Sequence, residues 1–357
     1  MRVLVCTVVH HTTDARIFRR EIGALCDAGV QVVAIAPWPR SEVADPGYQR
    51  IAIPRAVGRR RWAAWRAARA RISALAVGAQ ALIIHDPELL LVIPWRELRR
   101  LQVRVIWDVH EDLAAALSVK AYLPLPVRRL LGPAVHLLER WAEGRATLLL
   151  AESAYAGRFA RQHQVVLNLP PVPAALPLGS RERQAIYVGS ITRARGLDAM
   201  LEMAPLLAAH GIGLRLIGEA PNAEDAARIR ATPNVRWDGA LPNAEALREV
   251  EHSMVGLALL QDLPNYRHSM PTKILEYMAS GAAVVATPLP LSRSVLGDDG
   301  VVLPSFDGVA AAAAEAVIAL CDGAEAREAK TSAAFRKVQQ HYNWQRAQAE
   351  FVNAVRG

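Results

Sequence analysis

The chain has 357 residues, 52% of them hydrophobic, and a formal net charge of +8. This composition excludes a largely disordered chain and allows two domains of ordinary size. The three cysteines, Cys6, Cys26 and Cys321, are far apart and lack metal-ligand spacing, which indicates a reducing compartment without a disulfide framework. No apolar run reaches the length of a membrane span.

Short apolar segments alternate with helical patterns through the first half of the chain. A helix is expected over residues 17–28, ending at Gly29. The opening segment is interpreted as a first strand and not as a signal peptide, because it has no cleavage site of small residues. The predicted strands are residues 3–9, 30–36, 81–84, 103–109 and 147–151.

The positive charge is unevenly distributed. Residues 1–180 hold 24 Lys and Arg against 14 Asp and Glu, whereas the remainder holds 18 against 20. Seven arginines lie between Arg55 and Arg71, together with Trp62 and Trp65. Such a segment suits an anionic membrane surface, although a solvated helix face is the alternative. Nucleic acid is the less favoured partner.

A proline-rich stretch, residues 168–180, interrupts the alternation and indicates an extended linker. Strands and helices alternate on both sides of this linker, which predicts an α/β chain with two facing, doubly wound, Rossmann-like domains. The strands of the second series are residues 185–189, 213–217, 235–238, 255–260 and 283–287. The predicted division is residues 1–167, a linker at 168–183, a second domain at 184–340 and a final segment at 341–357.

Histidines follow three predicted strands of the first half: His10 with His11, then His85, then His110. Because the carboxyl ends of parallel strands share one edge, we expect these side chains to converge on one crevice. A lone histidine is usually structural, but three at equivalent positions favour a functional site. The acidic cluster around His110, residues 108–112, resembles a metal site. Neighbouring side chains at a strand end point to opposite sides, so no catalytic metal is expected.

In the second half, residues 269–287 predict a helix followed at once by a buried strand. Ser269 is expected to cap this helix, with Pro271 in its first turn. The helix amino end suits a phosphate or a sugar oxygen, and Lys273 and Glu276 lie close to it. A cation beside a carboxylate is what a nucleotide-sugar site needs, although an ordinary amphipathic helix has the same pattern.

Another predicted strand is followed by Gly189 and Ser190, and Arg195 stands near the next helix, where it can fork onto a diphosphate. No glycine-rich dinucleotide fingerprint and no P-loop motif occur, which disfavours a dehydrogenase and a P-loop kinase. No nucleophile elbow occurs either.

Taken jointly, these motifs resemble retaining glycosyltransferases of family 4, which have the GT-B fold. The matching segments are HHTTDARIFRREIGALCDAGVQVVAIA at 10–36, HDPEL at 85–89, WDVHED at 107–112, YVGSITRARGL at 187–197 and SMPTKILEYMASGAAVVAT at 269–287. The resemblance covers essentially the full chain and points to a bacterial subgroup that builds cell-surface polysaccharides and glycoconjugates. It implies that the first domain binds the acceptor and the second the donor. It also implies that residues 341–357 form a last helix that returns to the first domain.

The resemblance also implies roles for single residues. Arg195 would neutralise the diphosphate, His110 would contact the transferred sugar, and both are the expected catalytic residues. Glu276 would bind the donor ribose. The expected donor-binding set is Gly189, Ser190, Arg195, His268, Ser269, Met270, Pro271, Lys273 and Glu276. The acceptor-side candidates are His10, His11, Arg16 and His85.

Two residues depart from the family pattern. His268 stands where the family usually has a glutamate that holds sugar hydroxyls, which leaves the donor sugar open. Ser190 stands where a basic residue is usual, which leaves Arg195 as the main cation for the diphosphate. The expected protein is a hexosyl- or N-acetylhexosaminyltransferase that needs neither a metal nor a cofactor. It is expected in the cytoplasm, as a peripheral protein at the inner face of the plasma membrane. It would use a UDP-, GDP- or dTDP-sugar and a lipid-linked or glycan acceptor. The alternatives are a soluble small-molecule acceptor, a non-catalytic nucleotide-sugar-binding protein, and a sugar-nucleotide epimerase.

Overall fold

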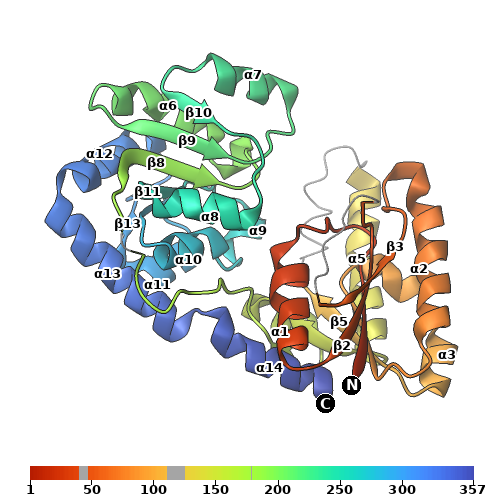
Figure 1. Ribbon diagram of the computed structural model, residues 1–357. Helices are drawn as coiled ribbons and strands as arrows, with labels where there is room; N and C mark the ends of the chain where they lie inside the picture. Colours follow the sequence, from red (N-terminus) through yellow and green to blue (C-terminus); the bar gives the residue numbers. More distant parts are fainter. Residues whose placement is uncertain (40–46, 111–124, 178) are drawn as a thin grey trace. The chain divides into compact units, whose positions relative to one another are not determined.

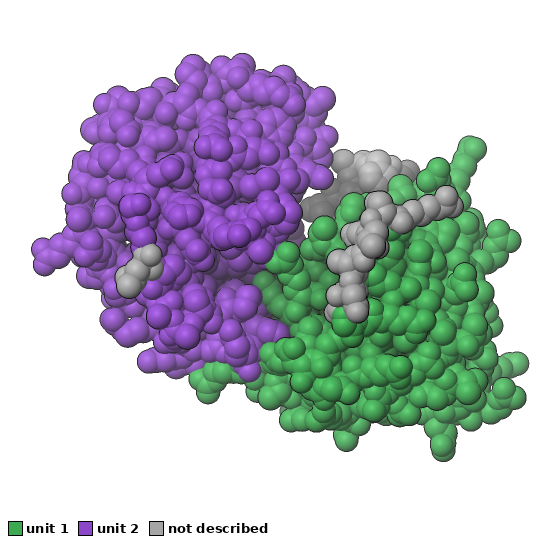
Figure 2. Space-filling view, viewed as in Figure 1, with its two compact units in different colours: residues 1–168, 346–357 green, residues 169–345 purple. Residues whose placement is uncertain are grey.

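In the computed structural model the chain forms two compact units, residues 1–168 with 346–357 and residues 169–345 (Figures 1 and 2). The structure describes residues 1–39, 47–110, 125–177 and 179–357. Each unit has one sheet, all of whose pairings are parallel, and its own hydrophobic core. No helix in these ranges is both long and apolar enough to cross a lipid bilayer.

The first unit is built on a seven-stranded sheet in the order β3-β2-β1-β4-β5-β6-β7 (Figure 1). Its strands are β1 (Arg2–Cys6), β2 (Gln31–Ala36), β3 (Gln49–Ala52), β4 (Ala81–Ile84), β5 (Arg104–Val109), β6 (Thr147–Leu150) and β7 (Gln164–Val165). Its longer helices are α1 (Ile22–Asp27), α2 (Arg61–Leu75), α3 (Trp95–Arg100), α5 (Leu125–Glu143) and most of α14 (Trp344–Arg356). A π-helix at Ala15–Glu21 precedes α1, and 3-10 turns occupy Gly58–Arg60, Pro87–Leu91 and Ser153–Arg158.

The second unit has a six-stranded sheet in the order β10-β9-β8-β11-β12-β13. Its strands are β8 (Glu182–Val188), β9 (Gly213–Ile217), β10 (Val235–Trp237), β11 (Ser253–Ala258), β12 (Ala283–Ala286) and β13 (Val301–Val302). Its helices are α6 (Leu197–Ala208), α7 (Ala223–Ala231), α8 (Asn243–Glu251), α9 (Pro264–Arg267), α10 (Thr272–Ala279), α11 (Pro290–Leu296), α12 (Val309–Asp322) and α13 (Ala324–His341). Short 3-10 turns occupy Arg193–Arg195 and Gly297–Asp299.

Every predicted strand is present, and three strands were not predicted: β3, β7 and β13. All three lie at a sheet edge, are at most four residues long and are partly exposed. They therefore lack the continuous apolar run that marks a strand buried on both faces. The first strand ends at Cys6, earlier than expected, because the next residues turn to bind the carboxylate of Asp86.

Two helix predictions need correction. The helix expected over residues 17–28 begins as a π-helix, which a 3.6-residue pattern cannot reveal, although it ends at Gly29 as predicted. The helix that Ser269 was expected to cap begins only at Thr272, with Pro271 as its N-cap residue and no side-chain cap. The Thr272 N–H binds the Met270 carbonyl at 2.8 Å, so residues 270–272 form a turn before the helix.

From Arg346 onward, α14 belongs to the first unit. Its carboxyl end is held by the guanidinium of Arg104, which donates to the Val355 carbonyl. Arg356 in turn donates to the Ala28 carbonyl at 2.8 Å. Cationic groups at helix carboxyl ends are stabilising because they offset unpaired carbonyls.

Candidate active site

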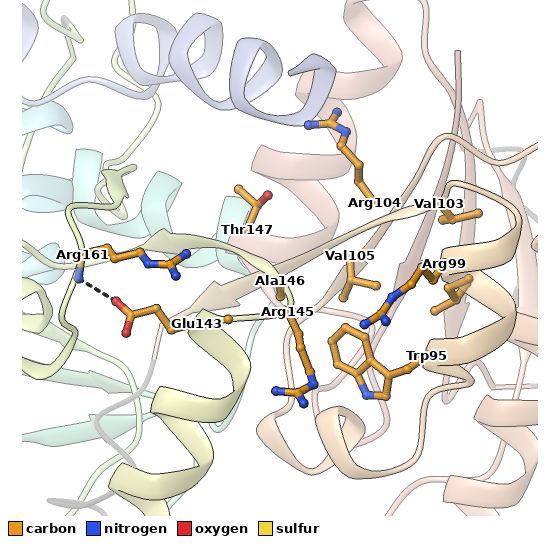
Figure 3. A pocket seen from close by; sticks show the side chains of 12 residues that line it. Trp95, Arg99, Val103, Arg104, Val105, Glu143, Arg145, Ala146, Thr147 and Arg161 are labelled. Carbon is orange, nitrogen blue, oxygen red and sulfur yellow. Dashed lines mark hydrogen bonds between the residues drawn. The ribbon is translucent and has the colours of Figure 1, made fainter.

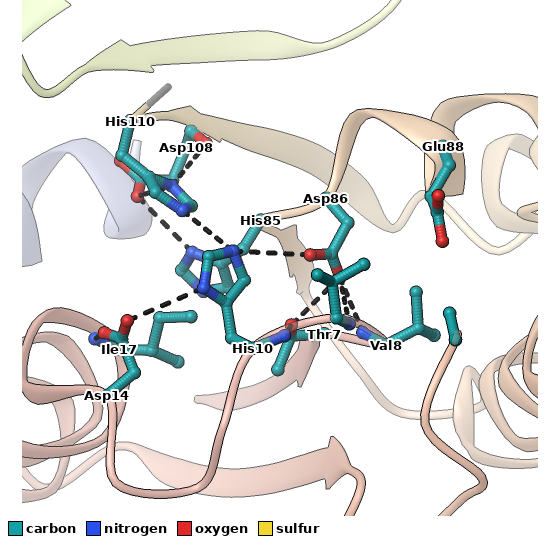
Figure 4. Close-up of polar contacts among 12 residues, drawn as sticks. Thr7, Val8, His10, Asp14, Ile17, His85, Asp86, Glu88, Asp108 and His110 are labelled. Carbon is teal, nitrogen blue, oxygen red and sulfur yellow. Dashed lines mark hydrogen bonds and ion pairs between the residues drawn. The ribbon is translucent and has the colours of Figure 1, made fainter. Parts of the chain in front are cut away.

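In the first unit, the strand order reverses between β1 and β4, and polar side chains gather at the carboxyl ends there (Figure 4). Asp86, just after β4, accepts hydrogen bonds from the Thr7 hydroxyl at 2.9 Å and from the Val8 N–H at 2.5 Å. This carboxylate ties the end of β1 to the end of β4. Such a reversal is where ligands bind in open α/β sheets.

His10 and His110 meet at this edge of the sheet. Their Nε2 atoms are 3.0 Å apart, and the two side chains are 15% and 12% exposed. His110 Nδ1 lies 3.0 Å from the Asp108 carboxylate (Figure 4). His10 is flanked by Asp14 at 3.5 Å and Asp86 at 3.4 Å. The structure thus brings together two of the predicted histidines, which we call the histidine pair.

A buried ionic network lies behind the histidine pair. Arg16 forks onto both carboxylate oxygens of Asp108, with Nε 2.9 Å and Nη2 2.6 Å away, and it also lies 2.9 Å from Glu21. His85 Nδ1 is 3.3 Å from Asp108. Arg16 is only 5% exposed and His85 only 2%, so these two acceptor-side candidates are placed inside the unit, away from any surface that an acceptor could contact.

Burial and pairing set the charges of this network. Burial alone would raise the pKa of Asp108, but the Arg16 guanidinium holds it well below its usual value. Burial, together with the Asp108 charge, raises the pKa of Glu21 well above its usual value. Burial also lowers the pKa of His85. These shifts favour the charged forms of Arg16 and Asp108 and the neutral forms of Glu21 and His85.

His85, Asp108 and His110 offer ligand atoms within 4.8 Å of one another, which is close enough for a metal ion. The donor set does not fit one, however, because both oxygens of Asp108 already accept hydrogen bonds from Arg16. A divalent cation there would lie beside a buried guanidinium and be repelled by it.

His11, the remaining acceptor-side candidate, is exposed, and its Nε2 lies 2.6 Å from Arg55. The acidic residues that were expected to accompany His110, Glu111 and Asp112, lie outside the described residues.

In the second unit, the strand order reverses between β8 and β11, and a cavity of about 160 Å³ lies near that point. It is lined by five of the predicted donor-binding residues, Arg195, Ser269, Met270, Pro271 and Lys273. Tyr266, Leu260 and Ser292 also line it. We call this cavity the donor pocket.

Arg195 in the donor pocket is held by hydroxyls and not by carboxylates. It donates hydrogen bonds to Tyr187 and Tyr266, and no ion pair of the described residues includes it. Burial raises the pKa of Tyr187 to about 12, so its hydroxyl stays protonated and donates to the Ser190 carbonyl at 2.9 Å. Arg193, two residues earlier, is instead paired with Asp225 at 2.9 Å and Glu224 at 3.2 Å.

Lys273, in the first turn of α10, is the second cation of the donor pocket. Its ammonium lies 5.5 Å from the centre of the Tyr187 ring and occupies the space that a side chain at Gly189 would need. Burial, reinforced by the charge of Arg195 and opposed by Glu276, lowers the pKa of Lys273 to about 8. Two cations therefore share a partly enclosed space, which favours an anionic ligand.

The other predicted donor-binding residues lie around this pocket. Gly189 and Ser190 follow β8, and the positive φ of Gly189 (133°) suits the approach of Lys273. Glu276 is half-buried one turn along α10 and attracts Lys273 electrostatically. His268 is exposed and is not among the residues that line the cavity.

Tyr187 and Tyr266 were missed by the sequence analysis. Tyr187 lies within a strand and is indistinguishable there from a core residue, whereas Tyr266 lies in the four-residue helix α9. The only available signal was their closeness in sequence to predicted site residues.

A different hollow, of about 300 Å³, lies at the amino ends of β5 and β6 in the first unit (Figure 3). Trp95, Arg99, Arg104 and Arg145 line it, and its acid, Glu143, accepts a hydrogen bond from the Arg161 N–H at 2.7 Å. It contains none of the predicted site residues and lies at the opposite ends of the strands from the histidine pair.

Residues 182–322, which include the whole donor pocket, match the family model described as glycosyl transferases group 1. Sucrose-phosphate synthase from Thermosynechococcus elongatus is similar in structure at 17% identity, with a TM-score of 0.73 over 99% of this chain and 98% of that one. HepE from Anabaena, solved with UDP and glucose, gives 12% identity and a TM-score of 0.71 over 100% and 99%. The chain has the GT-B fold.

The GT-B fold confirms the predicted α/β architecture of two Rossmann-like domains. A third similar structure is WaaG, a glycosyltransferase involved in lipopolysaccharide biosynthesis, at 14% identity and a TM-score of 0.69 over 100% of both chains. The search of curated proteins found no match.

Proposed function

We propose that this GT-B chain is a glycosyltransferase that uses a nucleotide-sugar donor. The observation that carries the proposal is the pair of cations in the donor pocket, Arg195 and Lys273, of which Arg195 has no carboxylate partner among the described residues. A bound diphosphate would supply the negative charge that the two cations lack. The match to the group 1 family model and the HepE structures with UDP and UDP-glucose support this assignment.

The proposed chemistry follows from charge. Breaking the bond between the anomeric carbon and the phosphate leaves an oxocarbenium-like sugar and a diphosphate with growing negative charge. Arg195, Lys273 and the uncapped amino end of α10 would stabilise that charge without a metal. Attack from the same face, with the leaving phosphate taking the acceptor proton, retains the anomeric configuration and needs no carboxylate nucleophile. His110 would contact the sugar near the reacting carbon.

Turnover is the direct test of this function. Thermal-shift screening of UDP-, GDP- and dTDP-sugars identifies the donor, because a ligand at 100 times its Kd stabilises the fold by about 2.7 kcal/mol. Release of the nucleoside diphosphate from that donor, with an acceptor or slowly with water, is then expected. Binding without any release would favour a non-catalytic nucleotide-sugar-binding protein.

The lowered pKa of Lys273 makes a pH prediction. In the free protein the ammonium loses its proton as the pH rises through about 8, whereas a bound diphosphate favours the charged form. Nucleoside diphosphate affinity should therefore fall above that pH, by up to about tenfold per pH unit. The measurement is calorimetric titration of the wild type and of Lys273→Met between about pH 7 and 9.5. Equal pH slopes in the two proteins would show that Lys273 does not contact the diphosphate.

We further propose that the acceptor is lipid-linked and that the enzyme works in the cytoplasm at the inner membrane face. Helix α2 buries Ala64, Ala68 and Ile72 and presents the 70% exposed Trp62 outward. Several arginines in and just before this helix are exposed and have no partner among the described residues: Arg59, Arg60, Arg66 and Arg71. This surface is suited to anionic lipid.

Flotation with anionic liposomes tests the membrane proposal. The triple variant Arg59→Ala/Arg60→Ala/Arg66→Ala should bind about 100-fold more weakly, since each arginine near a membrane surface contributes about 1 kcal/mol. The matched control removes the same charge from α3, as Arg96→Ala/Arg99→Ala/Arg100→Ala, and should bind normally. Equal losses in both variants, or no salt-sensitive binding by the wild type, would favour a soluble acceptor.

A further inference from the structure

We infer that Asp108 is a positioning residue that fixes the tautomer and the orientation of His110, and that Arg16 holds Asp108 in place for this role. The inference rests on the proposed function, because the orientation of His110 matters to turnover only if His110 contacts the transferred sugar.

The contacts of His110 determine its tautomer. Its Nδ1 lies 3.0 Å from the Asp108 carboxylate and 3.2 Å from the Asp108 carbonyl oxygen, and both of these groups can only accept. The proton of a neutral His110 is therefore on Nδ1. Its Nε2 is then an acceptor, and it lies 3.0 Å from the Nε2 of His10, which must donate.

His10 is suited to be that donor. Its other ring nitrogen, Nδ1, faces Asp14 at 3.5 Å, and its Nε2 also lies 3.4 Å from Asp86. Burial alone would raise the pKa of Asp14, but the hydrogen bond and the charge of His10 lower it below its usual value. A carboxylate therefore faces each ring nitrogen of His10, and because carboxylates accept, the ring is placed to donate.

Asp108 is rigidly held. It is fully buried, and its carboxylate accepts from the Arg16 fork, His85 Nδ1 and His110 Nδ1, while the Glu21 carboxyl also hydrogen bonds to it. Arg16 is fixed in turn by the Val166 carbonyl, 3.2 Å from both of its terminal nitrogens. The carboxylate therefore cannot rotate away from His110 without breaking several buried charge-assisted hydrogen bonds.

Glu21 strengthens the pairing of Arg16 with Asp108. It is a second buried carboxyl beside the same guanidinium, and its raised pKa favours its neutral form. Asp108, whose pKa is lowered, is therefore the anionic partner of Arg16, and its Oδ2 accepts from both His85 and His110. An ion pair that served only stability would not need a hydrogen bond to a partly exposed histidine.

The variant that separates positioning from structure is Asp108→Asn. An asparagine keeps the size of the side chain, but Arg16 donates to both carboxylate oxygens, so either orientation of the amide sets its NH2 against the guanidinium. The fork is then lost and His110 Nδ1 loses its fixed carboxylate acceptor, which lets the ring proton move to Nε2 and breaks the contact with His10. The expected result is a loss of about 100-fold or more in kcat with little change in the KM for the donor, as when the carboxylate that orients a catalytic histidine is lost.

Selective ¹⁵N labelling of the ten histidines gives a readout that a structural role would not change. The ring signals of His110, assigned by their loss in His110→Ala, should show the Nδ1-protonated tautomer in the wild type and the Nε2-protonated tautomer in Asp108→Asn. An unchanged tautomer would overturn the inference, whether or not kcat falls. If Asp108→Asn does not fold, Arg16→Lys, which keeps the charge but loses the fork, should shift the His110 signals and lower kcat by a smaller factor. Unchanged signals and kcat in folded Arg16→Lys would also overturn it.

The same experiments separate this inference from the proposed function. If no donor is turned over by the wild type, the proposed function fails, while the tautomer measurement still decides the role of Asp108. If the wild type is active and His110→Ala has wild-type kcat, His110 has no role in turnover. The positioning of His110 by Asp108 would then not affect catalysis, and the inference would be wrong.

Discussion

Replacing Arg195 with alanine should weaken nucleoside diphosphate binding by about 10- to 100-fold. The physical reason is the loss of charge-assisted hydrogen bonds to phosphate, each worth about 1.5–3 kcal/mol when the ligand is charged. Arg195 is held in the donor pocket by two tyrosine hydroxyls and has no acidic partner among the described residues, so its charge is available to a ligand. Calorimetric titration of the best-binding nucleotide measures the change.

Arg193→Ala is the matched control for this prediction. Arg193 lies two residues away in the same 3-10 turn, but Glu224 and Asp225 already neutralise it. Its removal should leave the affinity within about twofold of the wild type, since an exposed ion pair contributes little. Equal weakening by the two variants would mean that overall positive charge, and not the geometry of the donor pocket, determines binding.

The second large effect is expected for His110→Ala, which should lower kcat by about 100- to 1,000-fold while the affinity for the nucleoside diphosphate stays unchanged. A group that stabilises charge developing only in the transition state contributes to kcat and not to ground-state binding. The measurement is nucleotide release under saturating donor, together with calorimetric titration of the product nucleotide.

His136→Ala serves as the control because His136 is an exposed histidine on α5 and is not part of the histidine pair. It should retain wild-type kcat. If His110→Ala also retained it, the histidine pair would be a structural feature of the first unit, and the catalytic centre would have to be sought elsewhere.

The fold could be predicted from sequence to the extent that burial leaves a signal. The central strand β4 was predicted at its observed bounds, because a parallel strand covered on both faces is continuously apolar. The bounds of β9 were also predicted, although Arg215 interrupts its apolar residues. The edge strands β3, β7 and β13 were not, because their short, half-exposed sequences resemble loops. The late start of α10 reflects the turn at Met270 and Pro271, which residue type alone does not reveal.

Around the histidine pair, the sequence predicted which residues come together but not which of them are buried. His10 and His110 meet as expected, yet Arg16 and His85 are buried. What distinguishes them is visible only in three dimensions: Arg16 pairs with Asp108, and His85 lies between Asp108 and Glu21.

One signal in the sequence did point to Asp108. In β5, Trp107 and Val109 belong to the hydrophobic core of the first unit. Strand alternation therefore puts Asp108 on the other face, two residues from His110 and on the same side as it. A carboxylate two residues before a strand-end histidine is a pattern from which the contact could have been predicted.

In the donor pocket, the sequence could not show which arginine is left without an acidic partner. Arg193 and Arg195 are identical in type and lie in the same turn, but one is neutralised by acids from α7 and the other by none of the described residues. The sequence motif favoured Arg195, while the reason, a missing carboxylate, is visible only in three dimensions.

We propose that the donor pocket binds a diphosphate between Arg195 and Lys273. A crystal structure of the protein with whichever of UDP, GDP or dTDP raises its melting temperature most tests this directly. We expect the diphosphate to contact both cations at the amino end of α10, with the ribose toward Glu276. A diphosphate bound away from these residues, or no stabilisation by any of the three nucleotides, would contradict it.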